Sequence, residues 1–366
     1  MLLIVNAGSS SLKLAVYDGP DPVAREAVEE IGTDGHAAAL DGALRRTGIR
    51  NSALQGAAHR VVHGGPRLTS ACRITSDVHD EITAAVPLAP LHNPAALVGI
   101  QAVARLLPNL PQYAVFDTAF HATNPKVAVT YALPLEERAR GIRRYGFHGL
   151  SYAALVRILS ARGPLPQRLL ACHLGNGASL CAIVNGRSVA TTMSYSPLDG
   201  LTMGTRTGQI DGNAVLRLVE DHGLDRAKTI LNRESGLLGL GGSSDLRTLH
   251  AAGTPEARFA LDHFAYWAVR HAGSMVAAMG GLDAVVFTGG IGENDAWMRN
   301  EILSGLVFMG VSSDPAANAR NESTLHDPTS RVAIWIVPAD EERQIALEAQ
   351  AVMMRKAQAV IAGEGA

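Results

Sequence analysis

A strand, a short loop of small polar residues and a second strand occur in this order at two places in the chain. The first copy, at 2–17, reads LLIV, then NAGSSS, then the alternating stretch LKLAVY. The second copy, at 169–184, reads LLACHL, then GNGAS, then LCAIV, and Asn185-Gly186 follows it. Asn-Gly is a strong hairpin signal, and it leads into a further strand at 187–191. The repeated pattern predicts two related halves that each begin with a β-meander.

The loop of the first copy has the composition of a phosphate-binding loop. Its Asn, Gly and Ser residues leave backbone N–H groups and hydroxyls accessible, and Lys13 adds a positive charge beside them. The same residue types also favour an ordinary hairpin turn. Taken alone, the loop therefore leaves both interpretations open.

Each half later contains a buried-strand pattern that ends in polar residues. These strands lie at 113–118 and 284–288, and the second continues into GGIGEN. In open α/β sheets, ligands bind at such strand ends. Helices are predicted at 256–279 and, as the last element, at 343–360, where Pro and Gly are absent. The pattern predicts an α/β fold.

Pro-containing segments at 87–94 and 162–166 are predicted to be hinges or loops. The chain's 366 residues exceed one typical core and fit two domains of about 150–200 residues each. With two such domains, we expect a cleft between them.

Composition excludes several classes of protein. The 32 basic and 34 acidic residues give a formal net charge of −2, so no nucleic-acid partner is expected. Cys72, Cys172 and Cys181 lack metal-ligand spacing and are predicted to be small buried apolar residues. No apolar run approaches the ~20 residues that span a bilayer, and no basic leader opens the chain. A cytoplasmic protein without a membrane partner is therefore expected.

Ten sequence blocks make a more specific argument when they are taken together and in order. They are NAGSSSLK at 6–13, HRVVHGG at 59–65, LAPLHNP at 88–94, FDTAFH at 116–121, YGFHGLS at 145–151, HLGNGAS at 173–179, PLDGLTMGTRTG at 197–208, SGLLGLGGSSDLR at 235–247, FTGGIGEN at 287–294 and DEE at 340–342. With these blocks the chain resembles the acetokinase family of the sugar kinase, Hsp70 and actin superfamily. It departs from that family in a shortened region between Lys13 and His59, at Gln209 and Gly212, and at Ala339-Asp340.

The resemblance implies a fold of two duplicated ribonuclease-H-like domains, each a mixed β-sheet flanked by helices, with the active site in the interdomain cleft. The first domain is expected at 1–120 with a returning helix at 344–366, and the nucleotide-binding domain at 121–343. The implied activity is reversible, Mg²⁺-dependent, in-line phosphoryl transfer from ATP to acetate, giving acetyl phosphate and ADP. Mn²⁺ is expected to replace Mg²⁺, and the protein is expected to be a homodimer.

Two alternatives to this activity stay open. One is a propionate or other short-chain acyl kinase. The other, from a different class, is a non-enzymatic ATP-binding protein of the actin or Hsp70 type. An acceptor site for a carboxylate would discriminate between the classes, because a protein of the second class has no use for one.

Three residues are implied to act on the transferring phosphoryl group or the acceptor. Arg60 is expected to hold acetate and Arg206 to stabilise the transition state, since a guanidinium fork binds carboxylates and phosphoryl groups in bidentate fashion. His148 is expected to donate to the phosphoryl group. In the family Asp117 is assigned as an acid/base, but acetate is already ionised at neutral pH. We therefore hypothesise that Asp117 orients an arginine and supports the water shell of the metal.

The remaining expected site residues fall into three groups by ligand. Asn6 and Glu341 are expected to bind Mg²⁺, with Glu342 as the neighbour that could be confused with Glu341. The acyl pocket is expected to consist of Val62, Leu91, His92, Phe147 and Pro197; Val62 favours acetate over propionate, and a buried core histidine is the alternative for His92. The nucleotide is expected at Lys13, His173, Leu174, Gly175, Asn176, Gly177, Asp245, Leu246, Arg247, Gly290, Ile291, Gly292, Glu293 and Asn294. Small Gly290 followed by Ile291 favours ATP over pyrophosphate.

Overall fold

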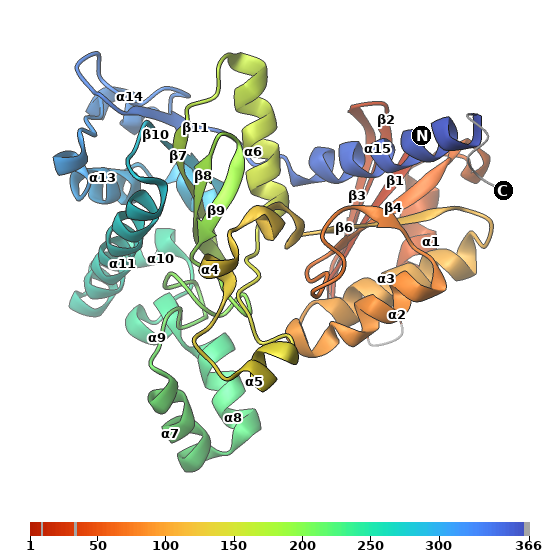
Figure 1. Cartoon of the computed structure of the whole chain (residues 1–366), viewed down its shortest axis with the longest axis horizontal. Helices are drawn as coiled ribbons and strands as arrows, with labels where there is room; N and C mark the ends of the chain where they lie inside the picture. Colours follow the sequence, from red (N-terminus) through yellow and green to blue (C-terminus); the bar gives the residue numbers. More distant parts are fainter. Residues whose placement is uncertain (9, 33–34, 362–366) are drawn as a thin grey trace. The chain divides into compact units, whose positions relative to one another are not determined.

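The computed structural model describes residues 1–8, 10–32 and 35–361, so Ser9 of the first loop lies outside it. The chain divides into two compact units (Figure 1). Unit 1 contains Met1–Ala122, Gly149–Ala154 and the chain from Asp340 on, and unit 2 contains Thr123–His148 and Leu155–Ala339. Each unit is built on one mixed sheet.

The sheet of unit 1 has the strand order β3-β2-β1-β4-β6-β5. Strands β1, β2 and β3 form an antiparallel meander, β4 and β6 run parallel to β1, and the short β5 is antiparallel to β6. The bounds are β1 Leu2–Ala7, β2 Leu12–Asp18, β3 Asp21–Val28, β4 Gly56–Val61, β5 Cys72–Arg73 and β6 Gln112–Phe116.

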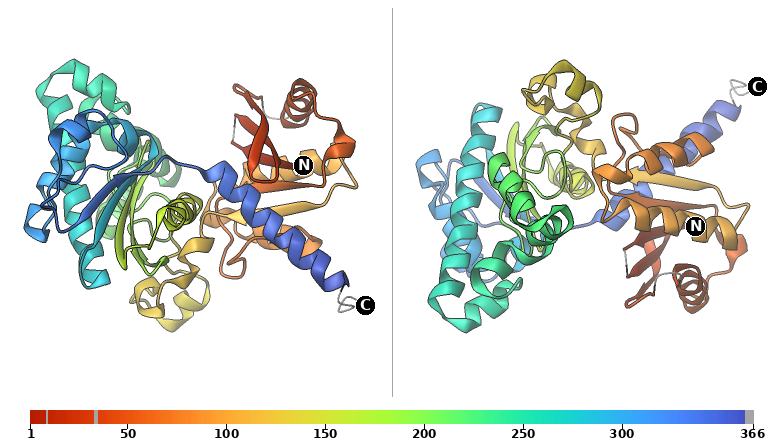
Figure 2. Two further views of the ribbon diagram at one scale, coloured as in Figure 1. Left: turned by 90° about the horizontal axis from the view of Figure 1, so that it is seen from above. Right: turned by 90° about the horizontal axis from the view of Figure 1, so that it is seen from below.

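Helices cover both faces of this sheet, which explains why β1 is apolar at every position from 2 to 5. Successive side chains of a strand point to opposite faces. Leu3 therefore packs with α1 and α3, whereas Leu2 packs with α15. Figure 2 shows α15 on one face and α2 with α3 on the other. The bounds are α1 His36–Arg46, α2 Ser76–Ala84, α3 Asn93–Leu106 and α15 Glu341–Ile361, with 3₁₀ turns at Asn51–Ala53, Val86–Leu88 and Ala119–Thr123.

The sheet of unit 2 repeats the topology of unit 1. Its order β9-β8-β7-β10-β11 matches β3-β2-β1-β4-β6, with an antiparallel meander followed by two strands parallel to β7. Asn185 and Gly186 both have positive φ angles, 50° and 77°, as a tight hairpin requires. The predicted duplication is confirmed. The bounds are β7 Arg168–Leu174, β8 Ala178–Val184, β9 Arg187–Thr191, β10 Ala284–Thr288 and β11 Ala333–Ile336.

Unit 2 carries most of the helices, and the long α11 packs against β7, β8 and β9. Helix α6 starts in the part of the chain assigned to unit 1 and continues in unit 2. The helix bounds are α4 Lys126–Val129, α5 Leu135–Ala139, α6 Gly149–Arg162, α7 Gly212–His222, α8 Leu224–Thr229, α9 Gly236–Gly241, α10 Leu246–Ala252, α11 Pro255–Met279, α12 Gly289–Asn294, α13 Ala296–Ser304 and α14 Pro315–Ala319; a π-helical turn spans Ile230–Glu234 and a 3₁₀ turn Val307–Met309.

Most predicted elements are confirmed, but several details are corrected. Helix α11 matches the predicted helix at 256–279, and the terminal helix begins two residues early, at Glu341. The predicted loop at 87–94 is wrong at both ends, because a 3₁₀ turn covers Val86–Leu88 and Pro94 fits the first turn of α3. Cys172 and Cys181 are buried, whereas Cys72 is half-buried because it lies in the edge strand β5.

The segment after β10, which contains three glycines, is the short helix α12. Glycine is a poor helix former, so this helix depends on hydrogen bonds that side chains make to its backbone. A carboxylate oxygen of Glu293 accepts from the backbone N–H of Gly289 at 2.9 Å, and Arg299 donates to the Gly292 carbonyl at 3.0 Å.

Among the described helices, none combines the length and the apolar character that crossing a bilayer requires.

Candidate active site

An ion pair between two neighbouring parallel strands is the centre of the site in unit 1. Arg60 lies in β4 and Asp117 directly follows β6. The Arg60 Nε donates to Asp117 Oδ1 at 3.1 Å and Nη2 donates to Oδ2 at 2.6 Å. The side chain of Asp117 is only 2% exposed, and that of Arg60 is 23% exposed. Because both carboxylate oxygens accept, Asp117 fixes the plane of the guanidinium.

Burial and charge act in opposite directions on this pair. Burial disfavours charge on Arg60, but the carboxylates of Asp117 and Glu341 outweigh it and raise the pKa of Arg60. Burial also raises the pKa of Asp117, and the Arg60 guanidinium opposes that rise. The positive charge of Arg60 and the negative charge of Asp117 therefore stabilise each other against the effect of burial.

A pocket of about 330 Å³ opens beside Arg60 in unit 1. One wall comes from the first polar loop and its strands, and the other from Val62 and the chain before α3. The pocket therefore brings a cation, small apolar side chains and the loop together. Its lining residues are Asn6, Ala7, Gly8, Ser11, Lys13, Arg60, Val62, Leu91 and His92.

The first loop is both a turn and a pocket wall, so the two interpretations of its sequence hold together. The Gly8 N–H donates to the Ser11 carbonyl at 2.8 Å and closes the turn. A Cβ at Gly8 would lie 2.6 Å from the Ser11 hydroxyl, so a larger residue would force that side chain to move. Asn6 and Lys13 are register partners in β1 and β2 and both line the pocket.

The two glutamates that begin α15 have different partners. Glu341 Oε2 lies 4.0 Å from Arg60 Nη2, whereas Glu342 accepts from Arg25 Nε of β3 at 2.9 Å. Glu341 is therefore the carboxylate that faces the Arg60 group.

The oxygen donors of Asn6 and Glu341 fit a Mg²⁺ ion, which prefers oxygen ligands and keeps most of its water when it is bound with substrate phosphates. The described residues contain no group of three or more His, Cys, Asp or Glu side chains that could hold a metal ion.

His148 is the centre of the site in unit 2. It adopts the left-handed conformation (φ 59°, ψ 20°) directly before α6, which costs an L-residue about 1–2 kcal/mol. Its Nδ1 lies 2.9 Å from the Ser179 hydroxyl, and its ring packs against His173 with centroids 4.1 Å apart. Ser179 and His173 are register partners in β8 and β7, so the second copy of the repeat positions the imidazole. Phe147, which precedes His148, is buried.

Arg206 is half-buried beside the glycine loop, the GNGAS segment at 175–179 that joins β7 to β8. Its Nη1 donates to the Pro197 carbonyl at 3.2 Å and contacts Met203 Sδ at 3.8 Å. A Cβ at Gly177 would lie 3.7 Å from Arg206 Nη1 and 3.3 Å from His148 Nε2. These three residues therefore surround one point.

The charge of Arg206 is not compensated locally. In the part of the chain that the structure describes, no carboxylate forms an ion pair with it, and burial lowers its pKa. A half-buried guanidinium whose described partners are a carbonyl and a thioether is suited to an anionic ligand.

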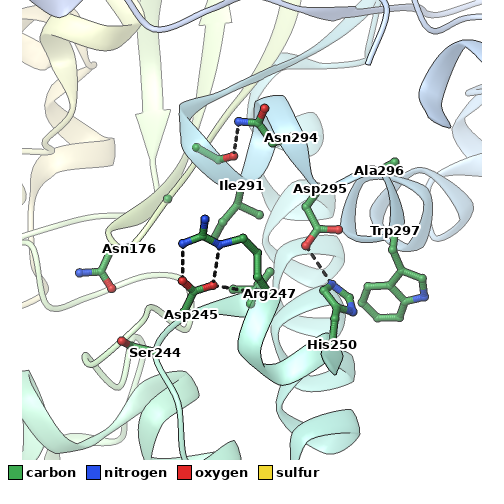
Figure 3. A pocket seen from close by; sticks show the side chains of 13 residues that line it. Asn176, Ser244, Asp245, Arg247, His250, Ile291, Asn294, Asp295, Ala296 and Trp297 are labelled. Carbon is green, nitrogen blue, oxygen red and sulfur yellow. Dashed lines mark hydrogen bonds and ion pairs between the residues drawn. The ribbon is translucent and has the colours of Figure 1, made fainter. Parts of the chain in front are cut away.

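A second pocket in unit 2, of about 820 Å³, lies between α10, α12 and the glycine loop (Figure 3). Figure 3 shows the Arg247 guanidinium against Asp245, and their hydrogen bonds lower the pKa of Asp245 to about 2. Eight expected nucleotide residues line this pocket: Gly175, Asn176, Asp245, Leu246, Arg247, Gly290, Ile291 and Asn294.

Sequence reasoning missed five lining residues, Ser244, His250, Asp295, Ala296 and Trp297. At one end of the pocket, His250 Nε2 lies 2.9 Å from Asp295 Oδ2, and its ring meets Trp297 edge to face (Figure 3). His250 lies one helical turn after Leu246 in α10, so a helix prediction there could have found it. Asp295 and Trp297 directly follow the FTGGIGEN block.

Other expected nucleotide residues do not line this pocket. Leu174 and Gly292 are buried in the fold, and His173 packs against His148. The Glu293 carboxylate is occupied by the backbone N–H groups of Gly289 and Ala339. Gly177 belongs with Arg206, and Lys13 lies in unit 1.

Two duplicated mixed sheets with a pocket beside the glycine-rich loop are typical of kinases of the actin-like fold. The model of the acetokinase family matches residues 36–347, and the chain belongs to this family. It is 41% identical to an acetate kinase of Rhodopseudomonas palustris, over 94% of this chain and 96% of that one. It is 42% identical to an acetate kinase of Geobacillus kaustophilus, over 94% and 97%.

Solved structures agree with this assignment. An acetate kinase of Porphyromonas gingivalis superposes with a TM-score of 0.87 at 34% identity, covering 96% of this chain and 99% of that one. A propionate kinase of Francisella tularensis gives a TM-score of 0.89 at 33% identity with the same coverage. Structural similarity therefore includes kinases named for two different acyl substrates.

Proposed function

We propose that the chain transfers the γ-phosphoryl group of ATP to acetate, reversibly and with Mg²⁺, to give acetyl phosphate and ADP. Relatives more than 40% identical over nearly the whole chain are named acetate kinases. The observation that carries the proposal is the pocket in which Arg60 stands beside Val62 and Leu91. A cation with a small apolar wall suits a short carboxylate, and a protein that only binds ATP has no need of one.

The proposed reaction is a direct in-line displacement. A carboxylate oxygen of acetate forms a bond to the γ-phosphorus while the bond to the oxygen bridging to the β-phosphorus breaks, and ADP leaves with that electron pair. Negative charge spreads over the equatorial oxygens of the transferring group. Arg206 and His148, which surround Gly177, are suited to stabilise that charge.

Asp117 has no proton to remove in this reaction, because a carboxylic acid is ionised at neutral pH. Its two bonds to Arg60 support a positioning role instead. We expect Asp117 to hold the guanidinium in the plane that a substrate carboxylate requires. We also propose that Asp117 supports the water shell of the metal.

Asn6 and Glu341 are the residues that would hold Mg²⁺, with Mn²⁺ as a substitute. The separate ion pair of Glu342 with Arg25 supports Glu341 as the ligand. When bound, the metal neutralises charge on the nucleotide phosphates.

ATP is proposed as the donor rather than pyrophosphate. A pocket of about 820 Å³ is far larger than a diphosphate needs and suits a nucleoside. A Cβ at Gly290 would meet nothing within 4 Å, so this wall leaves room for a base.

A propionate kinase activity is the second candidate, and the similar propionate kinase structure favours it. A hydroxamate assay of acyl phosphate formation tests both candidates with acetate, propionate and butyrate. One methylene is worth about 1–3 kcal/mol in a fitted pocket, or roughly 5- to 150-fold in kcat/KM. We expect acetate to have the higher kcat/KM. A higher kcat/KM for propionate would make propionate kinase the first candidate and contradict the proposed acetate kinase activity.

We also propose that the protein is a homodimer. Helix α7 has no buried residue, although Val215, Leu216, Leu218 and Val219 give it an apolar side, and Leu216 is 60% exposed. Such a side is normally covered in a soluble protein. Light scattering after gel filtration should give twice the chain mass, and Leu216→Asp should reduce it toward one chain mass if α7 lies in the interface.

A further inference from the structure

Helix α11 carries three aromatic side chains spaced one helical turn apart. They are His263, Trp267 and His271, with ring centroids 6.1 Å apart for the first pair and 5.9 Å for the second. Positions i, i+4 and i+8 share one face of a helix, so the three rings form a stripe. This stripe lies outside the two pockets and has no part in the function proposed above.

Hydrogen bonds connect two members of the stripe to the chain segment that carries Arg206. The Trp267 Nε1–H donates to His263 Nε2 at 3.1 Å. The other ring nitrogen, Nδ1, lies 3.0 Å from the hydroxyl of Thr202, which is only 3% exposed. An indole N–H is a donor only, so His263 Nε2 must be the acceptor. The neutral ring then carries its proton on Nδ1, and this N–H donates a hydrogen bond to the Thr202 hydroxyl oxygen.

The surroundings of His263 favour this neutral form. Burial lowers the pKa of His263. A proton on Nε2 would set two N–H donors against each other and break the bond to Trp267. The direction of donation is therefore fixed, from the indole to the imidazole and from the imidazole to the hydroxyl.

Thr202 is one residue from the turn that holds Arg206. The Met203 N–H donates to the Arg206 carbonyl at 3.2 Å, and Met203 Sδ contacts Arg206 Nη1 at 3.8 Å. The Met203 carbonyl accepts from the Leu237 N–H at 2.8 Å, and Met203 is fully buried. A shift of Thr202 would therefore move both the backbone and the sulfur that contact the arginine.

We propose that Trp267, His263 and Thr202 form a positioning chain that fixes the Met203–Arg206 turn and so aims the guanidinium at the transferring phosphoryl group. This inference rests on the proposed role of Arg206. The three residues do not touch substrate; they act through the turn. Their effect should appear in kcat, because a guanidinium that stabilises the transition state contributes little to ground-state binding.

Two matched pairs of variants test the chain. Thr202→Val removes the hydroxyl and keeps the shape, whereas Thr202→Ser keeps the hydroxyl. Trp267→Phe removes the indole N–H, whereas Tyr266→Phe changes its neighbour, which is 65% exposed. We expect Thr202→Val and Trp267→Phe to lower kcat about tenfold, since small misplacements of catalytic groups have effects of this size. Both KM values should stay within about twofold, and the two control variants should keep kcat.

Indole N–H signals in a ¹⁵N NMR spectrum give a second readout, which does not depend on turnover. The chain has three tryptophans. The signal lost in Trp267→Phe identifies Trp267, and that signal should shift in Thr202→Val but not in Thr202→Ser. If Trp267→Phe fails to fold, the Thr202 pair alone decides.

The outcomes separate this inference from the proposed function. If Arg206→Ala abolishes transfer while Thr202→Val and Trp267→Phe both keep kcat within twofold, the positioning chain is wrong and the proposed function stands. An equal loss of kcat in Thr202→Ser would also overturn it, because the hydroxyl would then not be the cause. If the unchanged protein forms no acyl phosphate, the proposed function fails, and the indole shift still tests the bonds themselves.

Discussion

The two arginines assigned to the reaction stand in opposite electrostatic surroundings. Arg60 is held by both oxygens of a buried aspartate and has Glu341 at 4.0 Å, whereas Arg206 has a carbonyl and a thioether as partners. The first is a compensated cation fixed before substrate arrives, and the second is a cation whose charge is left for the ligand. Arg60 lies in a strand of the first sheet, whereas Arg206 lies in a loop after the last strand of the second meander. If the proposed roles hold, unit 1 supplies the binding geometry for the acceptor and unit 2 supplies the charge that stabilises the transition state.

The largest effect should follow removal of the uncompensated charge. Arg206→Ala is expected to lower kcat by about 10³-fold or more, since arginines that stabilise phosphoryl transfer have effects of this size. Thermal stability should be unchanged or higher, because the variant removes a half-buried charge that has no carboxylate partner among the described residues. Steady-state kinetics and thermal denaturation measure the two effects. Arg206→Lys serves as the control, because it keeps the positive charge but lacks the planar guanidinium. If Arg206→Ala lowers kcat by less than tenfold, Arg206 does not take part in the phosphoryl transfer.

The compensated pair should respond differently. Arg60→Ala leaves the Asp117 carboxylate buried without its partner, so the free energy of unfolding should fall by about 3–5 kcal/mol. The pKa of Asp117 should rise further, because the guanidinium that opposes the effect of burial is gone. The stability deficit should therefore grow as pH increases and the carboxylate ionises. Urea denaturation between pH 5 and pH 8 measures this, and equal losses at every pH would contradict it.

Asp117→Asn separates positioning from acid/base chemistry in the same pair. The amide keeps one acceptor and loses the charge, so the KM for acetate should rise about 10- to 100-fold while the shape of the pH profile is kept. Loss of a titrating limb from the profile would support proton transfer instead. Near-normal turnover with added magnesium would remove any essential role for this charge.

Part of this comparison could be read from the sequence, and part could not. The strands of both copies follow from apolar runs broken by Gly and Asn, and the Asn185-Gly186 turn has the positive φ angles that its sequence requires. The sequence blocks predict Arg60, Asp117 and Arg206 as site residues. That Arg60 is paired and Arg206 is not could not be read, because the pairing depends on β4 and β6 being neighbours.

Tertiary contacts also decided the details that local pattern left open. Glu341 and Glu342 are adjacent and chemically identical, and their partners distinguish them, Arg60 for Glu341 and Arg25 for Glu342. Helix α12 forms in spite of its glycines, because the side chains of Glu293 and Arg299 make hydrogen bonds to its backbone. His250 and Trp297 come together from separate helices, so no spacing in the sequence indicates their contact.

Two buried histidines should make the stability of unit 1 depend on pH. In unit 1, burial lowers the pKa values of His59 and His63 to about 4. Between pH 6.5 and pH 4 the unfolded chain takes up protons that the folded chain refuses, so stability falls as pH falls, by up to about 1.4 kcal/mol per pH unit for each histidine. His59→Gln should reduce that slope by one proton, and the exposed His222 offers a control as His222→Gln. Urea denaturation at pH 7, 6 and 5 gives the change in the free energy of unfolding with pH for each variant. Equal changes in His59→Gln and His222→Gln would contradict the lowered pKa of His59.

The smallest expected effect concerns the wall beside the compensated arginine. Val62 lines the pocket of about 330 Å³ that contains Arg60, so Val62→Ala should admit a longer acyl chain without disturbing the ion pair. Because one methylene is worth at least about 1 kcal/mol, the ratio of kcat/KM for propionate over acetate should rise at least about fivefold. The kcat for acetate should change little, since Arg206 and its turn belong to the other unit. An unchanged ratio would place acyl selection elsewhere, and Leu91→Ala, at a side chain that lines the same pocket and is 44% exposed, would be the next variant to compare.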